Sequence, residues 1–160
     1  MSEKTLIVYY SWSGTTAKMA KLLQKVTNGK LEEIKVGADV FSNDMYQTSD
    51  IAQQQLVSGE LPEVQNISNL SDYDLILVGG PVWSGQVSTP VRSFLKQTSG
   101  FQGKIAPFYT SAGSDEKYET DFGKLTDGLD VVTGIGMTSG SLQNEESAST
   151  QLSDWIKQIN

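Results

Sequence analysis

The sequence contains neither cysteine nor histidine, and these two absences exclude more chemistry than any other feature of its composition. Without Cys there can be no disulfide bond, no thiolate metal site, no iron–sulfur cluster and no Cys nucleophile. Without His the chain lacks the commonest general base, the commonest metal ligand and every Ser-His-Asp triad. We therefore expect no metal site, and chemistry must depend on carboxylates, hydroxyls, Lys side chains or a cofactor.

The sequence also lacks long apolar runs. None approaches the length of about 18 residues that indicates a membrane-spanning helix, so no membrane partner is expected. The polar start, from Met1 to Thr5, is too short to hold the charged and apolar regions of a signal peptide. We therefore expect a cytoplasmic protein.

Positive charge is in deficit. Lys and Arg total 12 and Asp and Glu total 19, which gives a net charge of −7. Such a chain repels nucleic acid, so we expect no nucleic-acid partner. The same field would attract partner proteins with basic surfaces. The alternative is that this acidity only aids solubility.

The 160 residues, 38% of them apolar, suit one domain with one sizeable core over residues 1–160. Strand-like and helix-like patterns alternate five times along the chain, which predicts an open α/β domain with a parallel sheet and helices on both faces. The expected strands are residues 4–10, 30–36, 74–79, 104–110 and 131–137, and the expected helices are 17–28, 50–57, 89–100, 116–125 and 144–159.

The sequence carries clear capping signals at the starts of two expected helices. Thr89 precedes Pro90, which predicts Thr89 as the N-cap and Pro90 in the first turn. Asn144 is expected to cap the last helix, because Glu145 and Glu146 follow it where negative charge suits the helix dipole.

Ligands of open parallel sheets bind beyond the carboxyl ends of the strands, where strand order reverses. Three loops that follow expected strands are rich in Gly, Ser and Thr. They are SWSGTT (residues 11–16), GGPVWSG (79–85) and TSAGS (110–114).

The first loop has four hydroxyl side chains and one Gly ahead of a helix start. Hydroxyl and N–H donors there suit an oxygen-rich anion such as a terminal phosphate. The loop lacks the Lys of a Walker motif and two of the three glycines of a dinucleotide fingerprint. The alternative is a hydroxyl-rich helix cap. In the second loop, Trp83 could cover a flat ligand or pack beneath a turn.

The three loops together resemble those of the flavodoxin family. YYSWSGTT is similar to the family's phosphate loop, GGPVWSGQVSTPVRSFL to a flavin-ring loop with a Pro-Ile/Val-Trp motif, and APFYTSAGS to its third loop. The resemblance covers nearly the whole chain. It implies a doubly wound, five-stranded parallel sheet in the order 2-1-3-4-5, and FMN as the cofactor.

Carried over residue by residue, the resemblance places the FMN phosphate on the first loop and the flavin ring between the other two. The phosphate residues are Ser11, Trp12 (backbone), Ser13, Gly14, Thr15 and Thr16. The ring residues are Pro81, Val82, Trp83, Ser84 and Gly85 on one side and Thr110, Ser111, Ala112 and Gly113 on the other.

The sequence departs from the family's pattern at three positions. Thr15 stands where many members have Asn, Ser84 where this branch often has a second Trp, and Ala112 where many have Gly. The tyrosines that could cover the second ring face are Tyr46, Tyr109 and Tyr118.

The resemblance implies a monomeric electron carrier that shuttles single electrons between redox partner proteins with basic docking surfaces, with no catalytic residue of its own. The alternative is an FMN-dependent NAD(P)H reductase of quinones or similar small substrates. Arg92 is the only Arg, so no basic cluster for a dinucleotide is evident. A third possibility is an interaction domain that has lost FMN, which the intact hydroxyl loop disfavours.

Overall fold

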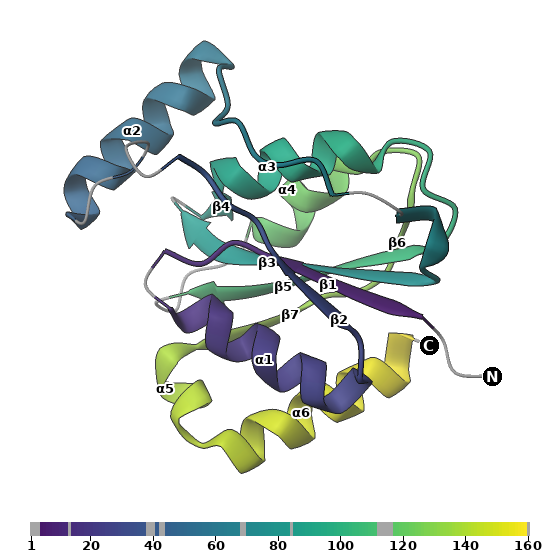
Figure 1. The fold of residues 1–160 in the computed structure, drawn as a ribbon. Helices are drawn as coiled ribbons and strands as arrows, with labels where there is room; N and C mark the ends of the chain where they lie inside the picture. The colour runs from purple at the N-terminus through teal and green to yellow at the C-terminus, as the bar shows by residue number, and fades with distance from the viewer. Residues whose placement is uncertain are drawn as a thin grey trace.

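A parallel sheet forms the centre of the molecule, with five strands in the order β2-β1-β3-β5-β6 (Figure 1). The structure is a computed structural model that describes residues 4–12, 14–37, 41, 44–67, 70–83, 85–111 and 117–159. Its strands are β1 (Thr5–Tyr9), β2 (Lys30–Glu33), β3 (Leu75–Trp83), β4 (Gln86–Val87), β5 (Lys104–Ser111), β6 (Asp130–Val131) and β7 (Ile135–Thr138). The predicted doubly wound parallel sheet is confirmed. It has seven strands and not five, because β4 pairs with β3 and β7 pairs with β5 in addition to the five strands in that order.

One extra strand comes from the second loop, which was expected to be irregular from Gly80 to Ser88. Strand β3 instead continues to Trp83, and the chain turns back as β4, which pairs antiparallel with it. Val82 lies opposite Val87 and Trp83 opposite Gln86. The ring loop of the sequence analysis is therefore a β-hairpin.

The other extra strand arises because the expected fifth strand is broken in two. Strand β6 pairs with Lys104 and Ile105, and β7 pairs with β5 again from Phe108 onward, so the pairing skips Pro107. Proline has no N–H to donate to a neighbouring strand. Gly134 lies so close to Pro107 that a Cβ there would overlap the Pro107 carbonyl oxygen.

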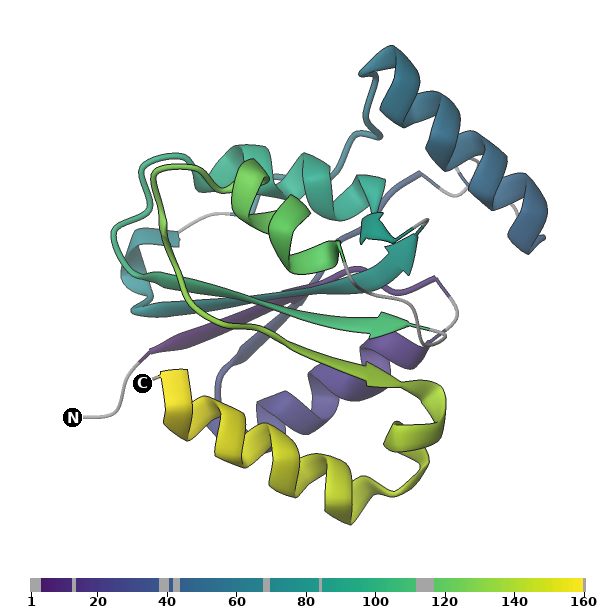
Figure 2. The ribbon, with the colours of Figure 1, turned by 180° about the vertical axis from the view of Figure 1, so that it is seen from behind.

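Helices cover both faces of the sheet. On one face lie α1 (Thr15–Thr27), α5 (Ser139–Gln143) and α6 (Glu145–Ile159), and on the other lie α3 (Thr89–Leu95) and α4 (Tyr118–Leu125) (Figure 2). Side chains of β1 alternate between the two cores: Ile7 packs with α1 and α6, whereas Leu6 and Val8 pack with α3 and α4. Short 3₁₀ turns occur at Leu70–Asp72 and Lys96–Thr98.

Helix α2 (Met45–Ser58) projects from the rest of the molecule (Figure 1). It begins five residues before the expected start at residue 50, because the Asp44 carboxylate caps it by accepting hydrogen bonds from the N–H groups of Tyr46 (2.8 Å) and Gln47 (3.2 Å). Val57 near its end is 90% exposed.

The predicted caps have mixed outcomes. Asn144 caps α6 as predicted, since its side-chain oxygen accepts from the N–H of Ser147 at 3.1 Å. The prediction of Thr89 as an N-cap is wrong: Ser88 occupies that position and Thr89 is the first helical residue, because β4 ends at Val87. None of the helices in the described ranges is long and apolar enough to cross a membrane.

Candidate functional site

Three loops meet at the carboxyl edge of the central strands. Strand β1 pairs with β3 and β3 with β5, all parallel, so the segments that leave them lie side by side. They lie beside the N-terminal end of α1, at the left of Figure 1. The structure thus brings together the described parts of all three loops that the sequence analysis singled out.

A buried hydrogen bond joins the first loop to the third. The Thr16 and Thr110 hydroxyl oxygens lie 2.7 Å apart, although the residues are 94 positions apart in the chain. Both residues are buried. The sequence predicts Thr16 on the phosphate; the structure shows its hydroxyl within hydrogen-bond distance of the Thr110 hydroxyl. Pro81 of the second loop lies opposite Thr110 in the β3–β5 register.

The first loop is shaped by one hydroxyl and one glycine. The Ser11 hydroxyl oxygen accepts hydrogen bonds from the N–H groups of Gly14 (3.0 Å) and Ala17 (3.2 Å). Gly14 is the N-cap of α1 and has a φ of 96°, a left-handed conformation that suits glycine. The loop residues carry no charge, and the positive end of the α1 dipole faces them. Neutral donors around a helix N-terminus can hold an anion without a basic side chain.

Trp83 of the second loop belongs to an aromatic cluster with Tyr10 and Phe41. Its ring makes edge contacts with Tyr10 (centroids 5.7 Å apart) and Phe41 (5.1 Å). Burial raises the pKa of Tyr10 to about 12. Tyr10 and Phe41 were missed by sequence reasoning, although Tyr10 directly precedes the hydroxyl loop. Trp83 is itself only partly buried, so it remains a candidate for contact with a flat ligand.

The three candidate tyrosines have different surroundings. Tyr109 and Tyr118 stack on each other inside the core, with centroids 4.4 Å apart, and Tyr118 is fully buried. Burial raises the pKa of Tyr118 above its ordinary value. Tyr109 donates a hydrogen bond to the Glu119 carboxylate at 2.7 Å. Tyr118 therefore has no ring face available to a ligand, whereas Tyr46 lies on α2 and is 81% exposed.

Four of the predicted contact residues lie outside the described residues. They are Ser13, Ser84, Ala112 and Gly113. Gly85 is described and has a φ of 75°, which suits its place in the hairpin turn. Within the described ranges, no cluster of three or more acidic side chains could hold a metal ion.

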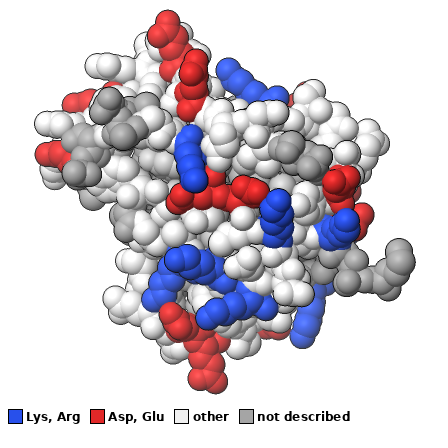
Figure 3. Space-filling view, viewed as in Figure 1, with Lys and Arg blue, Asp and Glu red and all other residues white. Residues whose placement is uncertain are grey.

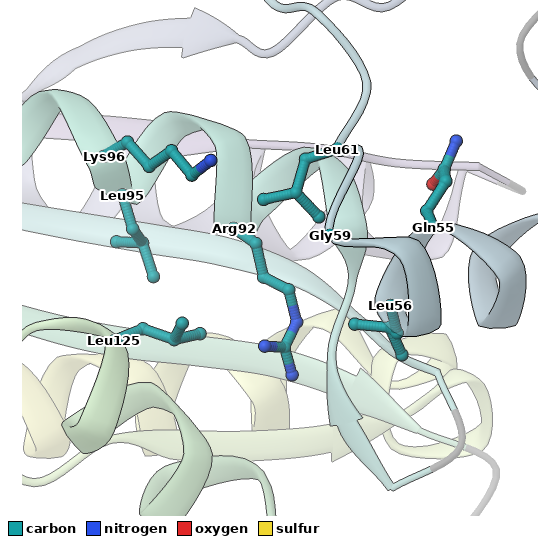
Figure 4. A pocket seen from close by; sticks show the side chains of 8 residues that line it. All are labelled: Gln55, Leu56, Gly59, Leu61, Arg92, Leu95, Lys96 and Leu125. Carbon is teal, nitrogen blue, oxygen red and sulfur yellow. The ribbon is translucent and has the colours of Figure 1, made fainter.

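A separate pocket of about 230 Å³ lies between α2, α3 and α4 (Figure 4). Leu56, Leu61, Leu95 and Leu125 supply most of its apolar lining, and Arg92 projects between Leu56 and Leu125. The pocket shares none of its lining residues with the three loops.

The fold and the loop edge define a class: an α/β protein with an open parallel sheet, whose candidate ligand loops leave the carboxyl ends of adjacent strands. The family model described as "Flavodoxin" matches residues 4–159. The chain belongs to the flavodoxin family.

Three relatives show how far the likeness extends. A flavoprotein from Lactobacillus acidophilus NCFM, crystallised in complex with FMN, is 41% identical; the match covers 88% of this chain and 97% of that chain with a TM-score of 0.80. Oxidised flavodoxin 2 from Bacillus cereus shares the fold at 18% identity, with coverage of 97% and 99% and a TM-score of 0.58.

The third relative carries an enzyme's name. "NAD(P)H dehydrogenase (quinone) 3" from Rhizobium meliloti (strain 1021) is 28% identical over 117 residues, which are 69% of this chain and 54% of that protein. The chain thus spans about half the length of this curated relative.

Proposed function

We propose that this chain binds FMN at the three loops and carries electrons between redox partner proteins. The observation that carries the proposal is the meeting of these loops at one sheet edge, where the Thr16–Thr110 hydrogen bond joins the first loop to the third. The L. acidophilus flavoprotein, which is in complex with FMN, supports it. The donors of the first loop are neutral hydroxyl and N–H groups, and such a set fits a phosphate monoester.

In this proposal, the hydroxyl groups of Ser11 and Thr15 hold the phosphate at the start of α1, and Gly14 lets the backbone turn around it. Pro81, Val82 and Trp83 of the hairpin face the ring from one side, and Thr110 and Ser111 face it from the other. Bound FMN supplies a ring that accepts and releases electrons. The protein's own part is to bind the ring, orient it and limit its contact with water.

A titration of the apoprotein with FMN and with riboflavin, the same ring without phosphate, tests this proposal. A single hydrogen bond to a charged group contributes about 1.5–3 kcal/mol, so we expect FMN to bind at least about tenfold more tightly. Equal affinities for the two flavins would remove the role of the phosphate loop. No binding of either flavin would overturn the proposal.

The second candidate function is an FMN-dependent NAD(P)H reductase of quinones or similar substrates. The likeness to the R. meliloti NAD(P)H dehydrogenase (quinone) favours it. Bleaching of the flavin absorption band after anaerobic mixing with NADH or NADPH decides between the two functions. Rapid, saturable bleaching without any added reductase would favour the enzyme, and very slow bleaching would favour the carrier.

We further propose that the carrier acts as a monomer and meets partners through their basic surfaces. The net charge of −7 supports such partners, because opposite charges steer two proteins together.

A further inference from the structure

Both backbone hydrogen-bonding groups of Val87 are held by charged side chains from two helices. The Arg92 Nε–H of α3 donates to the Val87 carbonyl oxygen at 2.9 Å. The Val87 N–H donates to the Asp121 carboxylate of α4 at 3.0 Å. The same carboxylate oxygen accepts a hydrogen bond from the Arg92 guanidinium, which closes the group into an ion pair. We call these two side chains and the Val87 backbone the Val87 latch.

The latch lies where solvent screens charge poorly. The Arg92 and Asp121 side chains are 13% and 18% exposed, in contrast to 61% and 36% for the ion pair of Lys30 and Glu32 on the edge strand β2. Leu56, Leu95 and Leu125 line the pocket around Arg92 (Figure 4). An ion pair in such surroundings is strong once formed, and removing one partner leaves a poorly solvated charge behind.

What the latch holds is the hairpin with the proposed ring residues. Val87 lies opposite Val82, one pair away from Trp83 and Gln86 at the hairpin end. On the other side, Asp121 belongs to α4, the helix that follows the third loop in the chain. Tyr118 of α4 stacks on Tyr109 of β5, which fixes that helix to the sheet. The latch thus sets the position of one proposed ring wall relative to the element that carries the other.

A short antiparallel pair of this kind needs such support. Strand β4 has two residues and pairs only with β3 within the described part of the chain, and isolated two-stranded hairpins are marginally stable in water. Because Val87 sits on the outer strand, its N–H and C=O would otherwise have no strand partner on that side. Side-chain hydrogen bonds from Arg92 and Asp121 take that place.

We infer that Arg92 and Asp121 are positioning residues that hold the β3–β4 hairpin in the conformation that receives the flavin ring, an inference that rests on the proposed function. If the hairpin spends only a fraction of its time in that conformation, the apparent affinity for the ring falls by the same fraction. The phosphate loop is built on β1 and α1 and does not depend on the latch. Loss of the latch should therefore weaken FMN and riboflavin equally.

The test uses Asp121→Asn, which keeps the side-chain shape but removes the charge, and Arg92→Lys, which keeps the charge but removes the Nε–H donor. Glu32→Gln is the matched control, because it removes one carboxylate from the exposed pair on β2. Equilibrium titration gives the Kd for FMN and for riboflavin. Hydrogen exchange of the Val87 amide in the apoprotein, compared with that of Leu77 in the sheet, reports on the hairpin without any flavin.

We expect both latch variants to raise the Kd for FMN and for riboflavin by the same factor, about tenfold if the competent population falls to a tenth. The ratio of the two Kd values should stay that of the native protein. The Val87 amide should exchange faster while Leu77 stays protected, and Glu32→Gln should change none of these.

Three results would overturn the inference. The first is native flavin affinity in both latch variants, and the second is a loss that falls on FMN alone. The third is an equal rise in exchange at Val87 and Leu77, which would mean that the pair only stabilises the whole fold. Failure of the native chain to bind either flavin is a different result, and it would overturn the proposed function itself.

Discussion

Hydroxyl groups in and around the sheet have very different hydrogen-bond partners in this molecule. The Ser11 oxygen accepts two backbone N–H groups, and Thr16 shares a hydrogen bond with Thr110. In contrast, the buried hydroxyls of Ser88 and Tyr118 have no hydrogen-bond partner among the described residues. We therefore expect removal of each hydroxyl to change the free energy of unfolding by a different amount.

Replacement of Ser11 by Ala should destabilise the apoprotein. Its oxygen satisfies two amides at the start of α1, and the loss of such a capping side chain costs about 1 kcal/mol. Urea unfolding of the apoprotein measures this. Thr150→Ala on the exposed face of α6 is the control and should change stability by less than about 0.5 kcal/mol. Equal stability of the Ser11 variant and the native chain would contradict the capping role.

Removal of the Tyr118 hydroxyl should cost little, since it breaks no hydrogen bond that the described residues provide. We expect Tyr118→Phe to change the free energy of unfolding by less than about 0.5 kcal/mol or to raise it. Tyr109→Phe is the matched variant: it loses the 2.7 Å bond to Glu119 and should cost about 1 kcal/mol. If thermal unfolding showed a larger loss of stability for Tyr118→Phe than for Tyr109→Phe, the Tyr118 hydroxyl would have a hydrogen-bond partner of its own.

For single residues, the sequence predicts which of them share a loop but not which hydrogen-bond partner each side chain has. SWSGTT predicts a donor-rich loop, and the structure has that loop at the start of α1. The Ser11 side chain turns back and accepts a hydrogen bond from the Gly14 N–H. This contact depends on the left-handed φ of Gly14 and on the direction in which β1 ends, and only the folded chain sets these two features.

Secondary-structure elements differ in how much they depend on the rest of the fold. Strand β1 and helices α1 and α6 lie close to where their apolar periodicity predicts them, because each buries one clear apolar set. The hairpin of β3 and β4 was missed because GGPVWSG carries the Gly and Pro signals of a loop. The break between β6 and β7 is caused by Pro107 in another strand, so no local pattern could indicate it.

Two glycines in regular elements should respond oppositely to replacement by Ala. Gly123 lies inside α4 with no atom within 4 Å of a Cβ there, so Gly123→Ala should stabilise the apoprotein by about 0.5–1 kcal/mol. A Cβ on Gly79 in β3 would overlap the Phe108 ring, so Gly79→Ala should cost about 1–3 kcal/mol. Guanidinium unfolding measures both. A stabilised Gly79 variant would mean that the Phe108 ring moves without cost.

Over the whole molecule, positive charge is concentrated although the total is negative. Lys18, Lys21 and Lys25 recur on α1, and Figure 3 shows basic side chains gathered in this region. The Lys18 Nζ atom also lies 3.8 Å from the Glu145 Oε1 atom of α6. If the proposed basic partner exists, these lysines make α1 a less favourable part of the surface for its contact.

The rate of electron transfer from a basic reductase should fall as salt rises, because salt screens the attraction between the two proteins. Stopped-flow reduction of the FMN-loaded protein over a range of NaCl concentrations measures this. Lys21→Glu should steepen that salt dependence or leave it nearly unchanged, since it adds negative charge to the protein and so strengthens the attraction to a basic reductase. A rate that rises with salt would contradict the proposal of basic partners.

Stability should also fall at alkaline pH. Burial raises the pKa of Tyr10 to about 12 from its ordinary value of 10.0. The unfolded chain therefore loses this proton at a lower pH than the folded chain does, so the contribution is complete below about pH 10 and is lost as pH rises toward 12. Tyr10→Phe should flatten the decline of thermal stability with pH in this window, and an unchanged decline would show that Tyr10 ionises with its ordinary pKa in the fold.

The central pairing of β1 with β3 has a consequence for biosynthesis. The Lys4 N–H donates to the Asp74 carboxylate across 70 positions in the chain, and Thr5 lies opposite Leu75. A ribosome that adds about 5–20 residues per second leaves β1 without its neighbour for several seconds. During that time Leu6, Ile7 and Val8 present an aliphatic strand to other nascent chains. Substitutions that slow this closure should therefore appear first as a lower yield of soluble protein in the cell, while the purified protein still binds its ligand normally.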